Sequence, residues 1–280
     1  MANDSERRIL RVIDHIHDNP AGDLSLDAMA DVAAMSRFHW HRVFRGLTGE
    51  TVAQCVRRMR LHRAAMALVL VLGDDTLPVI AAAVGYADAT TLTRAFSESY
   101  GMPPGAFRAR GELRPTSRLN PMKGPLMYAV EIRDLPDQHL VSTAHKGPYF
   151  EINRAFERLF ATLAARNLIG QTGHLVGVFR DDPSVTPAAD LRSHAAVIVE
   201  ADFAIPATLE AYMLPAGPHA VLTYQGPYAG LPAAYDQLYG LWLPHSGRSM
   251  ADRPSFEVYL NSPMNTAQED LLTALHLPLI

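Results

Sequence analysis

Hydrophobic positions over roughly the first 108 residues recur with helical spacing between short polar breaks. Four segments open with a side chain that caps helices well and continue with apolar residues three or four positions apart. The predicted helix starts are Ser25, Ser36, Thr76 and Asp88. A longer helix is predicted from Val52 to Leu72, and Gly85 and Gly101 mark helix ends. The pattern predicts an all-α N-terminal domain over residues 1–110.

The pattern changes after this region. Residues 111–125 are polar and contain several prolines and glycines, which predicts a linker. Beyond it, short runs such as Tyr128–Ile132 and Ala195–Val199 alternate between apolar and polar residues, as strands do. Two stretches of strongly helical pattern stand among these runs, near residues 150–166 and 229–243. We therefore expect a multidomain chain whose C-terminal domain, residues 126–280, is α+β.

The C-terminal half repeats itself at a shift of 79 residues. His145-Lys-Gly-Pro-Tyr149 aligns with Tyr224-Gln-Gly-Pro-Tyr228, and the same shift holds from Glu131 through Leu163. Val178-Phe179 then matches Val258-Tyr259 at a shift of 80. The repeat predicts two pseudo-symmetric strand-helix-strand-strand units that bury their apolar faces against each other. A cleft between such halves suits a ligand, although a duplicated scaffold without a pocket also fits the pattern.

Charge is distributed unevenly along the chain, although its net value of -4 does not favour nucleic acid. Residues 37–63 hold one acid, Glu50, and seven arginines. These arginines are Arg37, Arg42, Arg45, Arg57, Arg58, Arg60 and Arg63. Such a concentration predicts a phosphate-contacting surface, with a solvated basic helix face as the alternative. From residue 115 onward, 11 bases face 16 acids, which favours a neutral or cationic small molecule over nucleic acid as the ligand there.

Other kinds of chemistry find little support in the sequence. The single cysteine, Cys55, lies in a helical pattern and is read as a packing residue, so no internal disulfide is expected. The longest apolar run, Ala64–Leu72, is shorter than the roughly 20 residues of a membrane helix, and the N-terminus does not resemble a secretory signal. We expect a cytoplasmic protein with no membrane contact, metal, cofactor or catalytic residue.

Two helix-turn-helix patterns occur in the N-terminal domain, across residues 25–46 and 76–100. Such a unit places its second helix in the DNA major groove, where the first turns of that helix read the bases. The intervening helix Val52–Leu72 would be about 31 Å long. This length is close to the roughly 34 Å between successive major grooves on one face of DNA. One chain could therefore read two adjacent grooves.

Residues 5–110 resemble the AraC/XylS family of transcription regulators, through a series of ordered motifs. They are Met35-Ser36, Arg42 with Phe44, Gly49, Arg60-Leu61 with Ala64, Ile80, Val84-Gly85-Tyr86, Phe96 and Gly101-Met-Pro-Pro-Gly-Ala-Phe107-Arg108. The resemblance implies double-stranded promoter DNA and RNA polymerase as partners, and recognition helices beginning near Ser36 and Asp88. The implied DNA-binding residues are Arg37, Phe38, His41, Arg42, Arg45, Thr90, Thr91 and Arg94. Arg45 is expected to contact phosphate; Phe38 could instead pack in the core, and Thr90 and Thr91 could be ordinary helix-start residues.

Residues 127–280 resemble a GyrI-like, or SbmC-like, effector-binding domain. The motifs are the paired Gly-Pro-Tyr turns, Trp242-Leu-Pro-His-Ser-Gly247, Phe256-Glu-Val-Tyr259 and Asn261-Ser-Pro263. By itself, the alternation in Ser255–Leu260 would also fit an exposed strand glutamate at Glu257. The resemblance instead implies that this glutamate lies in a pocket for amphipathic, aromatic or cationic molecules. The implied ligand-binding residues are Glu257, Tyr259, Trp242, Tyr149 and Phe179.

The sequence thus favours a transcription regulator that senses a small-molecule effector. Some relatives of the GyrI-like type that lack a DNA-binding domain are thought to hydrolyse reactive small molecules with the same glutamate. A hydrolase or scavenger attached to a DNA-binding module is therefore the alternative. A protein that binds another protein through its C-terminal half is a third possibility.

Overall fold

The structure is a computed structural model and describes residues 4–35, 40–70, 75–111, 128–183 and 186–280. The predicted helix start at Ser36, the candidates Arg37 and Phe38, and nearly all of the predicted linker lie outside the described residues. The backbone of Arg42 is described, but its side chain is not.

The described part of the N-terminal domain is all-helical, as predicted. Its helices are α1 (Asp4–Asp18), α2 (Leu26–Ala33), α3 (Trp40–Thr48), α4 (Val52–Leu70), α5 (Leu77–Val84), α6 (Ala89–Tyr100) and α7 (Pro104–Gly111). Ser25 caps α2 by accepting the Ala28 N–H at 3.2 Å, and Asp88 caps α6 by accepting the Thr91 N–H at 2.7 Å. Thr76 precedes α5, but its side chain makes no capping hydrogen bond.

Helix α4 contributes side chains to both hydrophobic clusters of this domain. Its first half contributes Met59 to a buried cluster with Trp40 and Phe44. Its second half contributes Leu61 to another buried cluster, which contains Phe96. Because each cluster is the core of one helix-turn-helix unit, a shift of α4 relative to its surroundings would move both units.

The C-terminal domain contains an eight-stranded antiparallel sheet in the order β1-β6-β8-β7-β3-β4-β2-β5. The strands are β1 (Val130–Leu135), β2 (Gln138–Lys146), β3 (Leu175–Phe179), β4 (Arg192–Val199), β5 (Glu210–Leu214), β6 (Gly217–Gln225), β7 (Ser255–Tyr259) and β8 (Leu272–Pro278). Each repeat forms the expected strand-helix-strand-strand unit, preceded by one further strand. These leading strands are exchanged: β1 pairs with β6 of the second repeat, and β5 pairs with β2 of the first.

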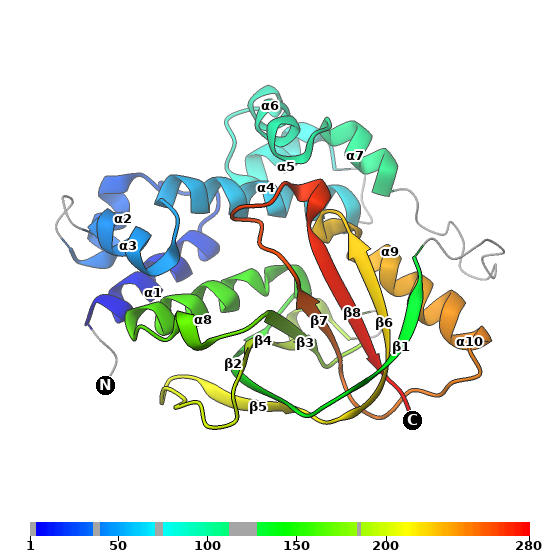
Figure 1. The fold of residues 1–280 in the computed structure, drawn as a ribbon. Helices are drawn as coiled ribbons and strands as arrows, with labels where there is room; N and C mark the ends of the chain where they lie inside the picture. Colours follow the sequence, from blue (N-terminus) through cyan, green and yellow to red (C-terminus); the bar gives the residue numbers. More distant parts are fainter. Residues whose placement is uncertain (1–3, 36–39, 71–74, 112–127, 184–185) are drawn as a thin grey trace.

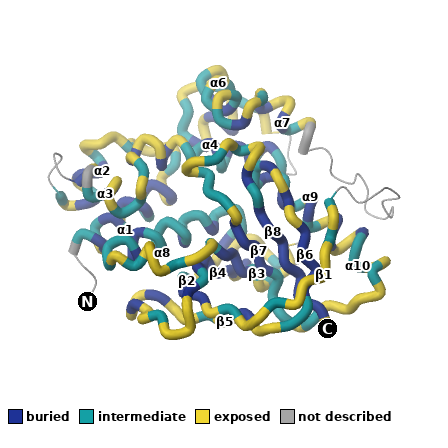
Figure 2. Tube along the Cα trace, viewed as in Figure 1, coloured by how far each residue is buried: buried dark blue, intermediate teal, exposed yellow. Residues whose placement is uncertain are grey.

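The two repeats meet at the central pair of strands, β3 and β7. In this pair Gly177 lies opposite Glu257, its counterpart at the repeat shift of 80. The pseudo-twofold axis of the domain therefore passes between these two residues. Buried positions concentrate in the central strands, whereas the edge strands β1 and β5 are largely exposed (Figure 2).

One helical layer covers one face of this sheet (Figure 1). In the first repeat the layer is a 3₁₀ turn, η1 (Tyr149–Glu151), followed by α8 (Asn153–Ala165). In the second it is a 3₁₀ turn, η4 (Tyr228–Gly230), then α9 (Leu231–Asp236), a π-helical turn (Gln237–Trp242) and α10 (Leu243–His245). Apolar side chains of α8 and α9 pack on the strands below them.

The two domains contact each other directly, with α1 and α3 lying on α8 and η4 lying against α4 (Figure 1). Ion pairs cross the contact. Arg154 binds Asp14 at 3.0 Å and Asp18 at 2.6 Å, and Arg166 binds Glu6 at 3.3 Å. The helical layer that covers the C-terminal sheet therefore also packs against the N-terminal domain.

Candidate functional site

The carboxyl group of Glu257 is buried at the centre of the C-terminal domain. The residue is 3% exposed, and its Oε2 atom accepts a hydrogen bond of 2.7 Å from the Tyr259 hydroxyl. Burial raises the pKa of Glu257 to about 7, although hydrogen bonding from Tyr259 and the nearby Tyr235 hydroxyl opposes the rise. The Tyr235 hydroxyl itself makes no well-formed hydrogen bond among the described residues. The site thus holds a carboxyl group that changes charge near neutral pH and a second buried hydroxyl close to it.

Aromatic rings surround this carboxyl group on the helix-covered face of the sheet. The Tyr259 ring contacts the Tyr228 ring at 5.4 Å and the Phe156 ring at 5.5 Å, both edge to face. Burial, reinforced by the charge of Glu257, raises the pKa of both Tyr228 and Tyr235. These phenols therefore stay protonated over the physiological range, and each can donate a hydrogen bond.

Gly177 provides the space in which two of these rings meet. A Cβ atom at this position would lie 3.0 Å from the Tyr259 hydroxyl oxygen and 3.0 Å from the Phe179 ring. Both distances are tighter than ordinary van der Waals contact, so any larger residue would require the Tyr259 hydroxyl or the Phe179 ring to shift. The small residue on β3 thus leaves room for the Tyr259 hydroxyl that binds the acid on β7.

Both repeats of the C-terminal domain contribute aromatic residues to the site. Its aromatic residues are repeat counterparts in three pairs: Tyr149 with Tyr228, Phe156 with Tyr235, and Phe179 with Tyr259. In the last two pairs the hydroxyl occurs in the second repeat, which also supplies Glu257. Polar chemistry is thus concentrated on one side of an otherwise pseudo-symmetric aromatic site.

Two of the residues proposed from the sequence lie at the edge of this arrangement. Tyr149 contacts Phe179 at 4.9 Å, and its hydroxyl donates a 2.8 Å hydrogen bond to the Asp181 carbonyl oxygen. Trp242 packs instead against the buried cluster under α9, and none of its described contacts joins it to Glu257. The residues that sequence reasoning missed are Tyr228, Tyr235 and Phe156; the repeat alignment held the signal, because each aligns with an aromatic residue in the other half.

Tyr259→Phe tests the electrostatics of this site. The hydroxyl hydrogen bond stabilises the ionised form of Glu257, so its removal is expected to raise the pKa of this carboxyl above its value of about 7. The midpoint for Glu257 titration should move to higher pH, by roughly one unit for each 1.4 kcal/mol lost. Infrared detection of the carboxyl C=O band across a pH series measures the shift, and Tyr149→Phe is the matched control. A midpoint unchanged in Tyr259→Phe would contradict the assignment.

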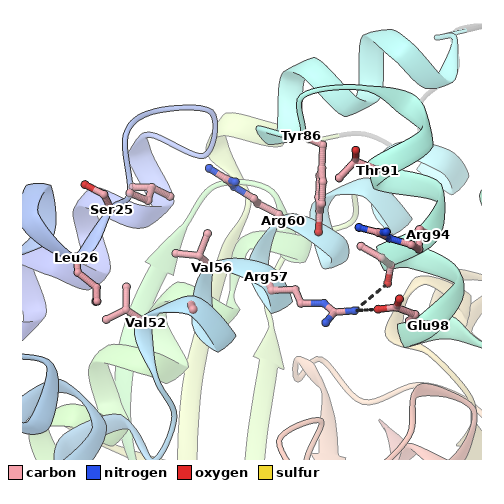
Figure 3. Close-up of a pocket in the computed structure, with 13 residues that line it drawn as sticks. Ser25, Leu26, Val52, Val56, Arg57, Arg60, Tyr86, Thr91, Arg94 and Glu98 are labelled. Carbon is pink, nitrogen blue, oxygen red and sulfur yellow. Dashed lines mark hydrogen bonds and ion pairs between the residues drawn. The ribbon is translucent and has the colours of Figure 1, made fainter.

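The described DNA-binding candidates lie on α3 and α6. His41 and Arg45 are exposed on α3, and Thr90 and Arg94 are exposed on α6, while Thr91 is half-buried beside the Asp88 cap. A cleft of about 690 Å³ runs along α4 between the start of α2 and one face of α6 (Figure 3). Arg94 lines it, together with Arg57, whose guanidinium binds Glu98 at 2.6 Å.

Several arginines of residues 37–63 form ion pairs or hydrogen bonds with other groups of the protein. Arg58 binds Glu50 at 2.6 Å and Glu157 at 2.8 Å. Arg60 donates to the Pro20 carbonyl oxygen at 2.9 Å, and Arg63 to the His17 carbonyl oxygen at 2.8 Å. The phosphate-contacting surface predicted from charge is therefore smaller than the sequence suggests.

The structure offers little other chemistry among its described residues. Within the described ranges, no group of three or more His, Cys, Asp or Glu side chains is placed to hold a metal ion. Cys55 is buried, in agreement with a packing role. Within the same ranges, no helix has the length and apolar character needed to cross a bilayer.

Residues 128–280 match the GyrI-like small molecule binding domain, and the chain belongs to this family. Residues 29–110 match a helix-turn-helix domain. The resemblance inferred from the sequence is therefore confirmed: the chain joins an AraC-type helix-turn-helix domain to a GyrI-like domain.

Curated relatives resemble one or the other part of the chain. An uncharacterised HTH-type transcriptional regulator, YbfP of Bacillus subtilis, is 33% identical over 103 residues, which is 37% of this chain and 34% of that protein. The transcriptional regulator Rob of Salmonella typhimurium is 32% identical over 120 residues, 40% of each chain. A DNA gyrase inhibitor of Yersinia enterocolitica is 29% identical over 138 residues, 48% of this chain and 87% of that protein. The chain thus spans well under half the length of the first two.

Proposed function

We propose that this protein is a DNA-binding transcription regulator whose GyrI-like domain binds an amphipathic aromatic cation at Glu257. The observation that carries the ligand class is a buried carboxyl group, with a pKa of about 7, among tyrosine and phenylalanine rings. A buried carboxylate needs a compensating charge, and a desolvated cation gains further from aromatic faces. The acidic balance of this domain supports the same ligand class.

A pair of similarly shaped compounds tests the ligand class. Methyltriphenylphosphonium is an aromatic cation, and triphenylphosphine oxide is its neutral counterpart. We expect saturable binding of the cation at least about tenfold tighter than that of the neutral compound, because a charge-assisted contact is worth roughly 1.5–3 kcal/mol. Isothermal titration calorimetry with the full chain measures both affinities. Equal affinities would contradict a role for charge at Glu257.

The DNA-binding part of the proposal rests on the exposed polar side chains of α3 and α6. Residues His41, Arg45, Thr90 and Arg94 can reach a partner without any change in the domain core. Arginine can bind guanine bidentately, and threonine can contact base edges. Recruitment of RNA polymerase at a promoter completes the proposed activity.

Arg94→Ala tests the second recognition helix. For a duplex that the protein has selected from a random-sequence pool, we expect specific affinity to fall by about 1–3 kcal/mol, with relaxed selectivity at one position. Arg45→Ala should instead weaken binding to all sequences and reduce the salt slope by about 1, as loss of a phosphate contact does. Gel-shift titrations at several salt concentrations separate the two effects. Arg133→Ala, on edge strand β1, is the control, and an Arg94→Ala result equal to this control would refute the assignment.

A hydrolytic role for Glu257 is the second candidate function. A carboxyl group with a pKa of about 7 suits general-base chemistry at neutral pH. Incubation with a strained epoxide distinguishes the candidates. Product formation that Glu257→Gln abolishes would favour a hydrolase, whereas saturable cation binding without turnover supports the sensor.

A further inference from the structure

Helix α4 of the DNA-binding domain lies against the walls of the candidate ligand site. The Gly-Pro-Tyr turns of both sensor repeats dock on it. In the first, the Phe150 carbonyl oxygen lies 2.9 Å from the His62 Nε2 atom. In the second, Ala229 belongs to the same buried cluster as Leu61 of α4. Since the two turns are repeat counterparts, α4 contacts equivalent points of both halves of the sensor.

A second contact between α4 and the ligand site is made by the side chain of Arg58. Its guanidinium binds Glu157 of α8, whose second carboxylate oxygen lies 2.8 Å from the His17 Nε2 atom. Glu157 directly follows Phe156, which contacts Tyr259. The Arg58 charge also opposes the effect of burial and of Glu257 on the pKa of Tyr228. Arg58 thus contacts α8 directly, and α4, which carries it, also lies against η4.

Entry of a ligand requires these walls to move, because Glu257 is 3% exposed and the Tyr259 ring beside it is in contact with both Tyr228 and Phe156. The interface against which they would move contains a largely buried ion pair. The side chains of Arg58 and Glu157 are 21% and 12% exposed, and removing either partner of such a pair leaves a charge uncompensated. A displacement of α8 or η4 would therefore act directly on contacts that α4 makes.

We infer that Arg58, through its pair with Glu157, is the positioning residue that couples occupancy of the Glu257 site to the placement of α4. Because α4 contributes to the cores of both helix-turn-helix units, a change in its placement alters the affinity of both units for DNA. This inference rests on the proposed function. Coupling of this kind is reciprocal, so DNA changes the affinity for the ligand by the same factor as the ligand changes the affinity for DNA.

The experiment measures methyltriphenylphosphonium affinity with and without saturating selected duplex, and duplex affinity with and without saturating cation. In the wild-type chain we expect both ratios to agree and to differ from one by at least about fivefold. In Arg58→Met, both ratios should fall to within about twofold of one, while the cation alone binds several-fold more tightly because its entry no longer disturbs the ion pair.

Two further variants serve as controls for this inference. Arg58→Lys keeps the charge but loses the planar fork that bridges two carboxylates, so the coupling ratio should fall at least by about half even if Arg58→Met does not fold. Arg166→Met breaks an ion pair with Glu6 elsewhere in the same domain contact and should keep the wild-type ratio. If the wild type binds cation and duplex independently, or if both Arg58 variants keep full coupling, the inference is overturned while the proposed function stands. If the wild type does not bind the cation, the proposed ligand class fails, and this inference fails with it.

Discussion

Glu257→Gln is expected to weaken binding of methyltriphenylphosphonium at about pH 8 by roughly 10- to 100-fold. The substitution keeps the shape of the side chain but removes a buried negative charge, and a charge-assisted contact is worth about 1.5–3 kcal/mol. The loss should be specific to charge, so binding of triphenylphosphine oxide should change by less than about threefold. Calorimetric titration of both compounds against both proteins gives the four affinities.

The pH dependence distinguishes this effect from a general disturbance of the pocket. The cation requires ionised Glu257, whose pKa is about 7 in the folded protein. Wild-type affinity should therefore rise about tenfold per unit as pH increases toward about 7 and then level off, whereas Glu257→Gln should show little pH dependence. A wild-type curve that is flat between about pH 5.5 and 8.5 would contradict the assignment.

Fold stability should change in the opposite direction. A carboxyl whose folded-state pKa is raised stabilises the fold while it is neutral, and this contribution is lost as pH rises from about 4.5 through about 7. Above this range the buried charge costs about 3 kcal/mol, and Glu257→Gln removes that cost. Urea unfolding at about pH 8 should find the variant more stable than the wild type, which is typical of residues kept for binding rather than for stability.

Local signals in the sequence predicted much of the helix-turn-helix domain. The starts of α2 and α6 follow from Ser25 and Asp88, because a cap acts on N–H groups only three residues away. The same logic placed Thr76 before α5, although its hydroxyl makes no capping bond there. Gly85 ends α5 at a φ of 87°, a conformation that favours glycine.

Contacts between distant parts of the chain could not be predicted in this way. The charge count treated Arg58, Arg60 and Arg63 as free for phosphate, because a count does not show which side chains bind a carboxylate or a backbone carbonyl oxygen within the protein. His17 likewise binds Glu157, which lies 140 residues away in the sequence. Charge density predicts a basic surface only after the intramolecular partners of each side chain are known.

The ligand site shows both the strength and the limit of repeat analysis. The repeat alignment pairs Gly177 with Glu257. The structure places these two residues opposite each other at the domain centre. A regular helical period, however, could not anticipate the π-helical turn at Gln237–Trp242, which changes the direction in which its side chains point. Trp242 packs under α9, while Tyr235, seven residues earlier, lies beside Glu257.

Replacement of Glu157 is expected to have the largest effect on stability. Burial alone would raise the pKa of this carboxyl, but His17 and Arg58 together lower it to about 2. Glu157→Ala leaves the buried Arg58 guanidinium and the His17 ring without this partner and should lower the free energy of unfolding by about 3–5 kcal/mol at neutral pH. Urea denaturation measures the change. Glu98→Ala, which removes an exposed partner of Arg57, is the matched control and should cost no more than about 1 kcal/mol.

The acid range shows whether the charge of Glu157 is responsible. A carboxyl whose folded-state pKa is lowered stabilises the fold above its unfolded value of about 4.5, and this contribution is lost as pH falls toward about 2. Glu157→Gln keeps the volume but cannot ionise, so the stability gap between wild type and variant should shrink by about 3 kcal/mol between these two pH values. Comparing the two proteins cancels the titration of their other carboxyl groups. A gap that stays constant with pH would mean that Glu157 stabilises the domain contact by packing alone, and that the ion pairs with Arg58 and His17 contribute nothing net.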